Sequence, residues 1–209
     1  MKDAGILTGK VSDFEKQLKD DFADMAVSVA KYGGFFVSRY EMGVDGASKK
    51  NQIVLVAGTA TDTNSDANTF TSTNLWYGLY KNSHKEITVN STPIFQSHMI
   101  YGSQYDQIIN FIGTNAQRGH STVQLTQQKV SGFNENDIMK NIFDLEGNNM
   151  ELTAERCNNR GRTPRGGWFA YAGLTTPIYF PASIRNFHTN AGVMNAYSFQ
   201  ATRSALFFK

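Results

Sequence analysis

The sequence predicts an α+β fold in which two helices are combined with short antiparallel strands and extensive loops. Two segments carry apolar residues at helical spacing, and runs of aromatic and β-branched residues between glycines are typical of strands. From Arg165 to Gln200 the chain contains no Lys, Asp or Glu and follows no regular period. This stretch therefore favours short strands joined by loops. Because no repeat or linker divides the sequence, we expect one domain over residues 1–209.

The first predicted helix begins at Ser12, which can form a capping box with Glu15, and ends near Gly33. After the helix, the aromatic run from Tyr32 to Gly43 predicts a strand, and Gln52 to Ala57 predicts a second, shorter one. The helix face expected to pack on the core recurs at three- and four-residue steps and comprises Phe14, Leu18, Phe22, Met25, Ala26 and Val29.

Further along the chain, residues 58–74 predict a polar surface loop, and the aromatic residues at 75–77 are expected to pack on the core. A second helix is predicted to be capped by Ser103 and to end at Gly113. Residues 203–208 predict a final buried strand. The inward face of the second helix is expected to comprise Tyr105, Ile108, Ile109 and Ile112.

Composition limits the classes of partner and the location. The formal net charge is +2, from 20 Lys and Arg against 18 Asp and Glu, so we expect no nucleic-acid partner and no binding to membrane surfaces. No apolar run reaches the roughly 18 residues of a membrane span, and the first residues lack the apolar stretch of a signal peptide. The virion, the cytoplasm and the cell surface all remain open as locations.

Five phrases occur in one order along nearly the whole chain: YGGFFVSRYEMG at 32–43, IYGSQYDQIINFIG at 100–113, FDLEGNNMELTAE at 143–155, RGG at 165–167 and RSALFF at 203–208. Together they resemble the domains of the formylglycine-generating-enzyme (sulfatase-modifying-factor) type. The resemblance implies a C-type-lectin-like fold. Met150 and Leu152 stand where that family usually has tryptophans, and residues 201–202 replace its Gly-Phe, so we expect altered packing.

Within these phrases, one set of residues is expected to form the structural framework. Glycine and asparagine are turn residues that adopt positive φ. Glu151 lies in an otherwise apolar strand and needs a buried partner, for which Arg203 is suited. The set comprises Gly147, Asn148, Glu151, Arg165, Gly166, Gly167 and Arg203.

The residues argue against the family's own reaction. Its aerobic enzymes oxidise a substrate cysteine with a pair of cysteines in the carboxy-terminal segment and copper, whereas the single cysteine here is Cys157. Nucleophile-elbow, nucleotide-loop and calcium-lectin motifs are absent. We therefore expect no enzyme and no cofactor, although the resemblance allows a structural calcium ion at Asp144 or Asn148. The histidines lack metal-ligand spacing and are expected to be packing or surface residues: His84, His98, His120 and His188.

A branch of this fold serves as the variable protein of diversity-generating retroelements, whose carboxy-terminal segment is rewritten at template adenines. The resemblance implies that residues 156–200 form a variable ligand-binding segment. Its Tyr, Phe, His and Asn side chains suit recognition surfaces. The candidate ligand-binding residues are Arg160 and Arg162 at the rim, with Phe169, Tyr171, Leu174, Thr175, Ile178, Tyr179, Phe187, His188, Asn190, Asn195, Tyr197 and Phe199.

The leading hypothesis is thus a bacterial or phage protein for receptor binding or surface display, with a protein or cell-surface ligand. One alternative is a non-diversified member of the same fold with a fixed protein or glycan partner. An enzyme of unknown chemistry ranks third. The aromatic residues of the segment could instead fill a core built from irregular strands. Oligomerisation is compatible with the resemblance, since phage receptor-binding proteins of this kind are often trimers.

Overall fold

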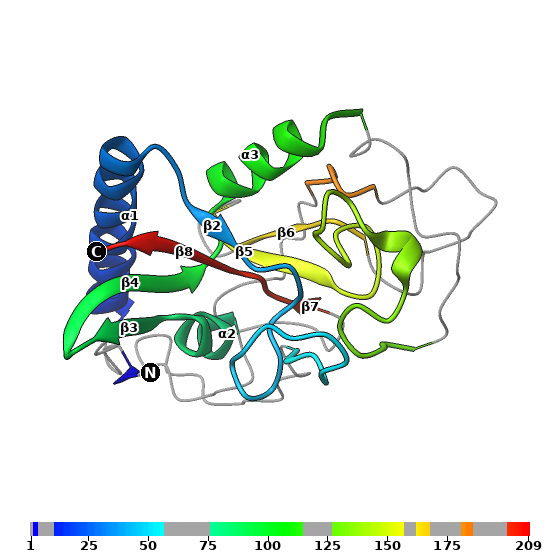
Figure 1. Cartoon of the computed structure of the whole chain (residues 1–209), viewed down its shortest axis with the longest axis horizontal. Helices are drawn as coiled ribbons and strands as arrows, with labels where there is room; N and C mark the ends of the chain where they lie inside the picture. Colours follow the sequence, from blue (N-terminus) through cyan, green and yellow to red (C-terminus); the bar gives the residue numbers. More distant parts are fainter. Residues whose placement is uncertain are drawn as a thin grey trace.

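The computed structural model describes residues 2–3, 11–56, 76–114, 127–156, 162–167, 181–185 and 200–209. This part of the chain has an α+β architecture with two sheets (Figure 1). The helices are α1 (Val11–Tyr32), α2 (Trp76–Ser83) and α3 (Gly102–Ile112), with a 3-10 turn η2 (Glu135–Asp137). The strands are β1 (Lys2–Asp3), β2 (Phe36–Val37), β3 (Lys85–Val89), β4 (Thr92–Met99), β5 (Met150–Arg156), β6 (Arg162–Arg165), β7 (Gln200–Ala201) and β8 (Ser204–Phe208).

The larger sheet is antiparallel, with strand order β1-β3-β4-β8-β2. The carboxy-terminal strand β8 lies inside this sheet, because Leu206 pairs with Phe36 on one side and with Ser97 on the other. Alternate residues of β8 are buried, namely Ala205 and Phe207. The prediction of a final buried strand is therefore confirmed.

Helix α1 packs on β8 and ends where the glycine signal predicts, since Gly33 has φ 81°. It begins at Val11, so Ser12 lies inside the helix and the predicted capping position is wrong. The predicted inward face is also partly wrong: Met25 is buried, but Phe22 is 44% exposed and Ala26 is exposed. The physical reason is a polar contact, because the buried Asp21 meets partners on α2 and β4 and turns the helix toward them.

Helix α3 begins at Gly102 rather than at Ser103, which is exposed. The start is stabilised by Gln104, whose side-chain oxygen accepts a hydrogen bond from the Tyr101 N–H at 3.1 Å. The predicted end is confirmed, since Gly113 follows the helix with φ 68°. Of the predicted inward residues, Ile109 is only half-buried, while Tyr105, Ile108 and Ile112 are buried.

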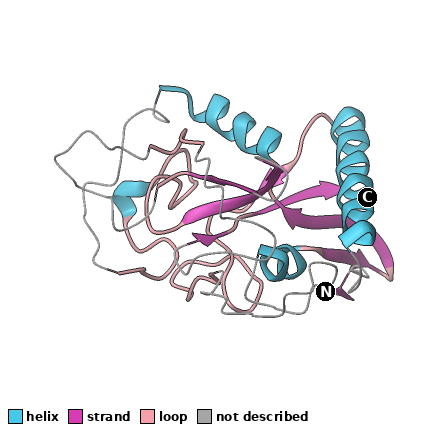
Figure 2. Cartoon of the chain, turned by 180° about the vertical axis from the view of Figure 1, so that it is seen from behind, coloured by secondary structure: helices cyan, strands magenta, loops and turns pink. Residues whose placement is uncertain are grey.

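The second sheet has the order β6-β5-β7, with β5 antiparallel to β6 and parallel to β7. Seen from behind, the molecule shows α1 and α2 on the same side of the larger sheet (Figure 2). A third helix, α2, occupies the place where only an aromatic island is predicted, and Trp76 is fully buried in it. The predicted strand at 52–57 is reduced to one isolated bridge between Val54 and Gly43. No described helix is long and apolar enough to cross a membrane.

Candidate functional site

The interior of the framework contains a fully buried ion pair between β5 and the residue that precedes β8. Arg203 donates from Nε and Nη2 to Oε1 of Glu151, at 2.9 and 2.5 Å. Its Nη1 donates to the carbonyl of Ser38 at 2.8 Å, and its Nη2 to the carbonyl of Phe143 at 2.6 Å. Both partners are 0% exposed. The predicted pairing is confirmed, and Arg203 joins four segments of the chain.

Other buried acids surround this pair. Asn148, in a left-handed conformation with φ 57°, donates from its amide to Oε2 of Glu41 at 2.6 Å and accepts the N–H of Lys129 at 2.9 Å. Burial raises the pKa of Glu41 well above its ordinary value, and the nearby Asp144 and Glu151 raise it further. A raised carboxyl pKa favours the protonated form, so Arg203 does not have to neutralise every acid of the cluster.

The predicted calcium ligands serve as hydrogen-bonding groups of the framework. Oδ2 of Asp144 accepts the backbone N–H of Gly132 at 2.6 Å, and burial raises the pKa of this carboxyl. Asn148 makes the contacts to Glu41 and Lys129 given above. Over the described ranges, no three His, Cys, Asp or Glu side chains are grouped so that they could hold a metal ion.

A second ion-pair network lies where β6 ends, against α3 and β5. Arg165 donates from Nη2 to Oδ1 of Asp106 at 2.5 Å, and its Nη1 lies 3.6 Å from Oε2 of Glu155. Arg185 contacts the same two acids, with Nη2 3.2 Å from Asp106 and 2.9 Å from Glu155. Burial raises the pKa of Glu155, although Arg185 and Arg165 act in the opposite direction. Each of the two arginines therefore contacts both carboxylates.

This network joins the two ends of residues 166–184. Arg165 and Arg185 form an antiparallel bridge, and the N–H of Gly166 donates to the carbonyl of Ile184 at 3.3 Å. The Arg165 guanidinium lies 4.7 Å from the centre of the Tyr105 ring, whose hydroxyl donates to the carbonyl of Ala182. Residues 165–166 and 184–185 therefore lie side by side on the framework.

Glycine is required where this segment begins. Gly166 has φ 69°, and a Cβ atom there would lie 2.2 Å from the carbonyl oxygen of Leu145. Both the backbone conformation and the close approach exclude a side chain. The Arg-Gly-Gly phrase at 165–167 therefore provides the ion pair and the bend at Gly166 that follows it.

Among the candidate ligand-binding residues, Arg162 is described by the structure. It is half-buried, and its guanidinium lies 4.6 Å from the centre of the buried Trp76 ring, a contact with the framework that sequence reasoning missed. The others lie outside the described residues: Arg160, Phe169, Tyr171, Leu174, Thr175, Ile178, Tyr179, Phe187, His188, Asn190, Asn195, Tyr197 and Phe199. His120 lies outside them too.

His84 and His98 are both buried, in line with the expectation of packing residues. Nδ1 of His84 lies 3.3 Å from Oδ2 of Asp21. Nδ1 of His98 donates to the carbonyl of Met99 at 2.8 Å, and its Nε2 lies 3.4 Å from the amide nitrogen of Gln104. Burial lowers the pKa of His98 to about 3. The neutral imidazole of His98 is therefore part of the fold.

Acidification is expected to destabilise the protein through His98. The ordinary pKa of histidine is 6.5 and that of His98 is about 3, so between these values the unfolded chain binds a proton that the folded chain does not. Stability consequently falls as the pH falls, by up to about 2 kcal/mol between roughly pH 6.5 and pH 5. Urea unfolding of the wild type and of His98→Asn should show this loss in the wild type only. An equal loss in both proteins would contradict the assignment to His98.

No family model matches the chain, and neither a curated protein nor a solved structure matches it. A function can therefore be inferred from the residues themselves and from the geometry around residues 165 and 185.

Proposed function

We propose that the chain is a ligand-binding protein with a C-type-lectin-like fold of the formylglycine-generating-enzyme type. In this proposal residues 156–200 carry the recognition surface, diversified as in retroelement variable proteins, and the ligand is a protein or a cell-surface molecule. The observation that carries the proposal is the network of Arg165, Asp106, Arg185 and Glu155 at the base of residues 166–184. A loop whose two ends are held by a rigid framework can change its sequence without unfolding the core.

The order of elements supports the proposed fold. Strand β2, helix α3, strand β5 and the buried strand β8 occur in the order that the resemblance implies. The framework residues at 147–148, 151, 165–167 and 203 are all buried. Apart from Arg160 and Arg162, the candidate binding residues lie between residues 167 and 203. From residue 165 to residue 200 the strong charges are Arg165 and Arg185. Aromatic side chains give large contact areas with few rotatable bonds, and amide side chains add adaptable hydrogen bonds.

Replacing residues 168–180 by a Gly/Ser sequence of equal length tests the separation of loop and framework. We expect the free energy of unfolding to change by less than about 1 kcal/mol, because surface substitutions are usually tolerated. The anchor variant Asp106→Asn/Glu155→Gln should instead lose about 1–2 kcal/mol, since Arg165 and Arg185 then lose both carboxylates. If the segment belongs to the core, its replacement will cost more than about 3 kcal/mol, and the proposal fails.

Sequencing the gene and its flanks in the source population tests the diversification itself. A near-copy of codons 160–209 beside a reverse-transcriptase gene, differing only at its adenines, would identify the altered positions directly. We expect these positions to exclude Trp168, Met194 and Gln200, whose codons are not reached from an Asn codon. An invariant 3′ end without such a copy would leave a fixed protein or glycan partner as the function.

A further inference from the structure

Cations held over exposed aromatic rings form a strip at the end of the molecule away from α1 (Figure 1). The ammonium of Lys140 lies 4.4 Å from the centre of the Phe111 ring, and that of Lys129 lies 5.6 Å from the centre of the Phe133 ring. The two phenylalanines are 59% and 53% exposed. We call this surface the basic strip and define it as Arg39, Lys50, Phe111, Lys129, Phe133, Glu135 and Lys140.

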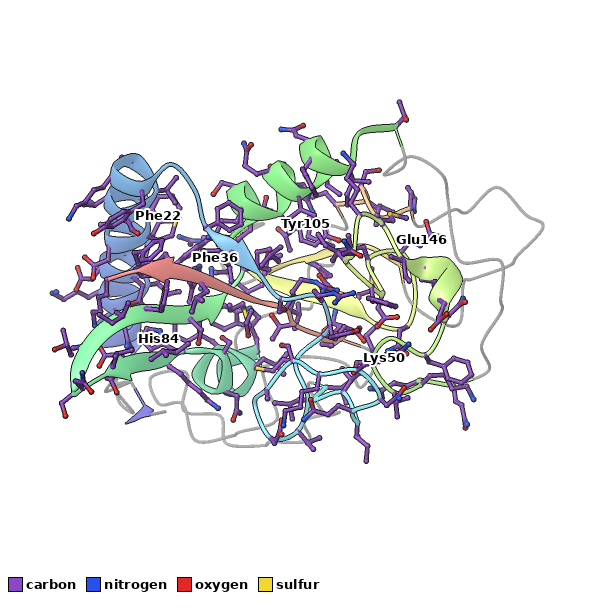
Figure 3. All side chains as sticks on the ribbon, viewed as in Figure 1. Phe22, Phe36, Lys50, His84, Tyr105 and Glu146 are labelled. Atoms are coloured by element: carbon purple, nitrogen blue, oxygen red, sulfur yellow. The ribbon has the colours of Figure 1, made fainter. Side chains whose placement is uncertain are left out.

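Two further cations connect these contacts. Arg39 and Lys50 both lie 5.8 Å from the centre of the Phe143 ring, which is itself buried. Arg39 donates from Nε to the carbonyl of Asn141 at 3.1 Å, and Lys140 is the neighbouring residue. Arg39 therefore links Lys50 to Lys140 across the surface. Figure 3 shows Lys50 on the loop after β2, toward the end of the molecule opposite α1.

Glu135 is the carboxylate of the strip and completes its continuity. Its Oε1 accepts a hydrogen bond from Lys50 at 2.6 Å, and Phe133 lies two residues before it in the chain. The Glu135 side chain is 72% exposed, so water weakens this ion pair and another carboxylate can compete for Lys50.

The charge of the strip is not balanced from within the chain. Its four cations and one carboxylate give it a formal charge of +3, while the whole chain carries +2, so the remaining residues together carry −1. Among the residues that the structure describes, Arg39, Lys129 and Lys140 have no carboxylate within ion-pair distance, and they contact rings and carbonyls instead. Positive charge is therefore concentrated on this surface.

The donors that remain on these cations suit carboxylates. Arg39 uses Nε for Asn141, which leaves the edge formed by Nη1 and Nη2 for a bidentate carboxylate. The ammonium of Lys140 donates to the carbonyl of Phe111 at 2.6 Å and keeps two further donors. This bond holds the ammonium beside an exposed ring. A partner that reaches Lys140 with a carboxylate therefore brings its neighbouring side chain onto Phe111.

We propose that the basic strip binds an acidic segment of another protein, in which carboxylates alternate with apolar or aromatic side chains. The carboxylates meet Arg39, Lys129 and Lys140, and the apolar side chains cover the exposed rings. This surface is separate from residues 156–200, so the proposal does not depend on the function proposed above.

The charges favour a protein segment over other anionic partners. A phosphate backbone or anionic lipid headgroups would bring like charges close to the exposed carboxylate of Glu135. A protein segment can instead place a hydroxyl or a cation opposite Glu135. The net charge of only +2 also gives a nucleic acid or a membrane little attraction to the molecule as a whole.

Selection from a library of short random peptides tests this assignment. Displayed peptides are selected on the wild-type protein, and the enriched sequences are synthesised for measurement of Kd by fluorescence anisotropy. We expect these sequences to combine Asp and Glu with apolar or aromatic residues. Their Kd should rise at least about tenfold in Arg39→Gln/Lys140→Gln. For the wild type it should also rise between roughly 0.02 M and 0.3 M salt, because salt screens exposed charges.

Lys16→Gln/Lys19→Gln is the matched control, because it removes the same charge from two exposed residues of α1, at the other end of the molecule. Its Kd should stay within about twofold of the wild-type value. The variant with residues 168–180 replaced by Gly/Ser should also bind like the wild type, which separates the strip from the candidate recognition segment. Phe111→Ser/Phe133→Ser should raise the Kd at least about threefold through the loss of apolar contact. Far-UV circular dichroism and thermal unfolding check that each variant is folded.

The proposal is overturned if no acidic peptide is enriched, or if the enriched peptides bind Arg39→Gln/Lys140→Gln as tightly as the wild type. It also fails if Phe111→Ser/Phe133→Ser binds them unchanged, because the strip then recognises charge alone. Oligothymidylate and phosphatidylserine vesicles are the competing probes. If either binds the wild type more tightly than the peptides do, and loses this binding in Arg39→Gln/Lys140→Gln, the strip belongs to a nucleic acid or a membrane instead.

Discussion

Replacing Arg203 by methionine is expected to lower the free energy of unfolding by about 3–5 kcal/mol, because removal of one partner leaves a buried charge without compensation. Glu151 would lose both hydrogen bonds from the guanidinium, and the carbonyls of Ser38 and Phe143 would lose their donors. Methionine has a similar length and no charge, so the effect reports the loss of the ion pair rather than a cavity. Urea unfolding followed by circular dichroism measures the difference.

The pH dependence gives a second readout for the same variant. Burial raises the pKa of Glu151 even in the presence of Arg203, whose charge acts in the opposite direction. Without that charge the folded-state pKa rises further, so the variant gains relative stability as the pH falls and the carboxyl takes up a proton. The gap between the wild type and Arg203→Met should therefore narrow from neutral pH toward about pH 5.

The double variant Glu151→Leu/Arg203→Met is the control for a specific pair. Replacement of both partners by apolar residues leaves no isolated charge and should recover part of the lost stability. A double variant that is no more stable than Arg203→Met would show that the loss comes mainly from the carbonyls of Ser38 and Phe143, which lack their donor in both variants.

The parts of the fold that follow local chemistry are predictable from the sequence. Gly33 and Gly113 end α1 and α3 because glycine accepts the positive φ found at both positions. The pairing of Glu151 with Arg203 is predictable because a carboxylate in an apolar strand requires a buried cation. The helix ends require no knowledge of distant contacts. The ion pair requires only the identity of one distant partner.

Other parts depend on contacts between distant segments. Asp21 is buried in α1 because Tyr80, His84 and Gln96 lie against it, and the apolar spacing of the helix contains no sign of these partners. Helix α2 is short and rich in aromatic residues, so its periodicity is weak. The hairpin between β3 and β4 turns at Asn90 and Ser91, both at positive φ, a signal that sequence reasoning missed.

The candidate site also contains some residues that the sequence predicts and others that it does not. Its framework residues follow from the phrases at 143–155, 165–167 and 203–208. The phrases at 100–113 and 143–155 contain Asp106 and Glu155 but do not predict their role, because these acids lie on α3 and β5, far in sequence from their partner Arg185. A signal was nevertheless present, since the two lone arginines of an otherwise charge-poor stretch require acidic partners from elsewhere in the chain.

Replacing Trp76 by alanine is expected to cost about 3–5 kcal/mol, the range for a large aromatic side chain in a core. The indole is 0% exposed, its Nε1–H donates to the carbonyl of Thr153 at 2.9 Å, and it stacks on Tyr80 with ring centres 5.5 Å apart. Trp76 also supports Arg162 at the start of β6. The alanine variant should therefore disturb the strand that leads into the candidate recognition segment as well as the core.

Trp76→Phe separates the two contributions of the indole. It keeps an aromatic ring against Tyr80 and Arg162 but loses the donor to Thr153, so we expect a smaller cost of about 1–2 kcal/mol. In this variant Trp168 is the remaining tryptophan, and its fluorescence reports on the candidate segment. If the recognition segment depends on the framework beneath it, the emission maximum of Trp168 should differ between Trp76→Ala and Trp76→Phe. The same emission maximum in both folded variants would mean that the segment is positioned by the Arg165–Arg185 network alone.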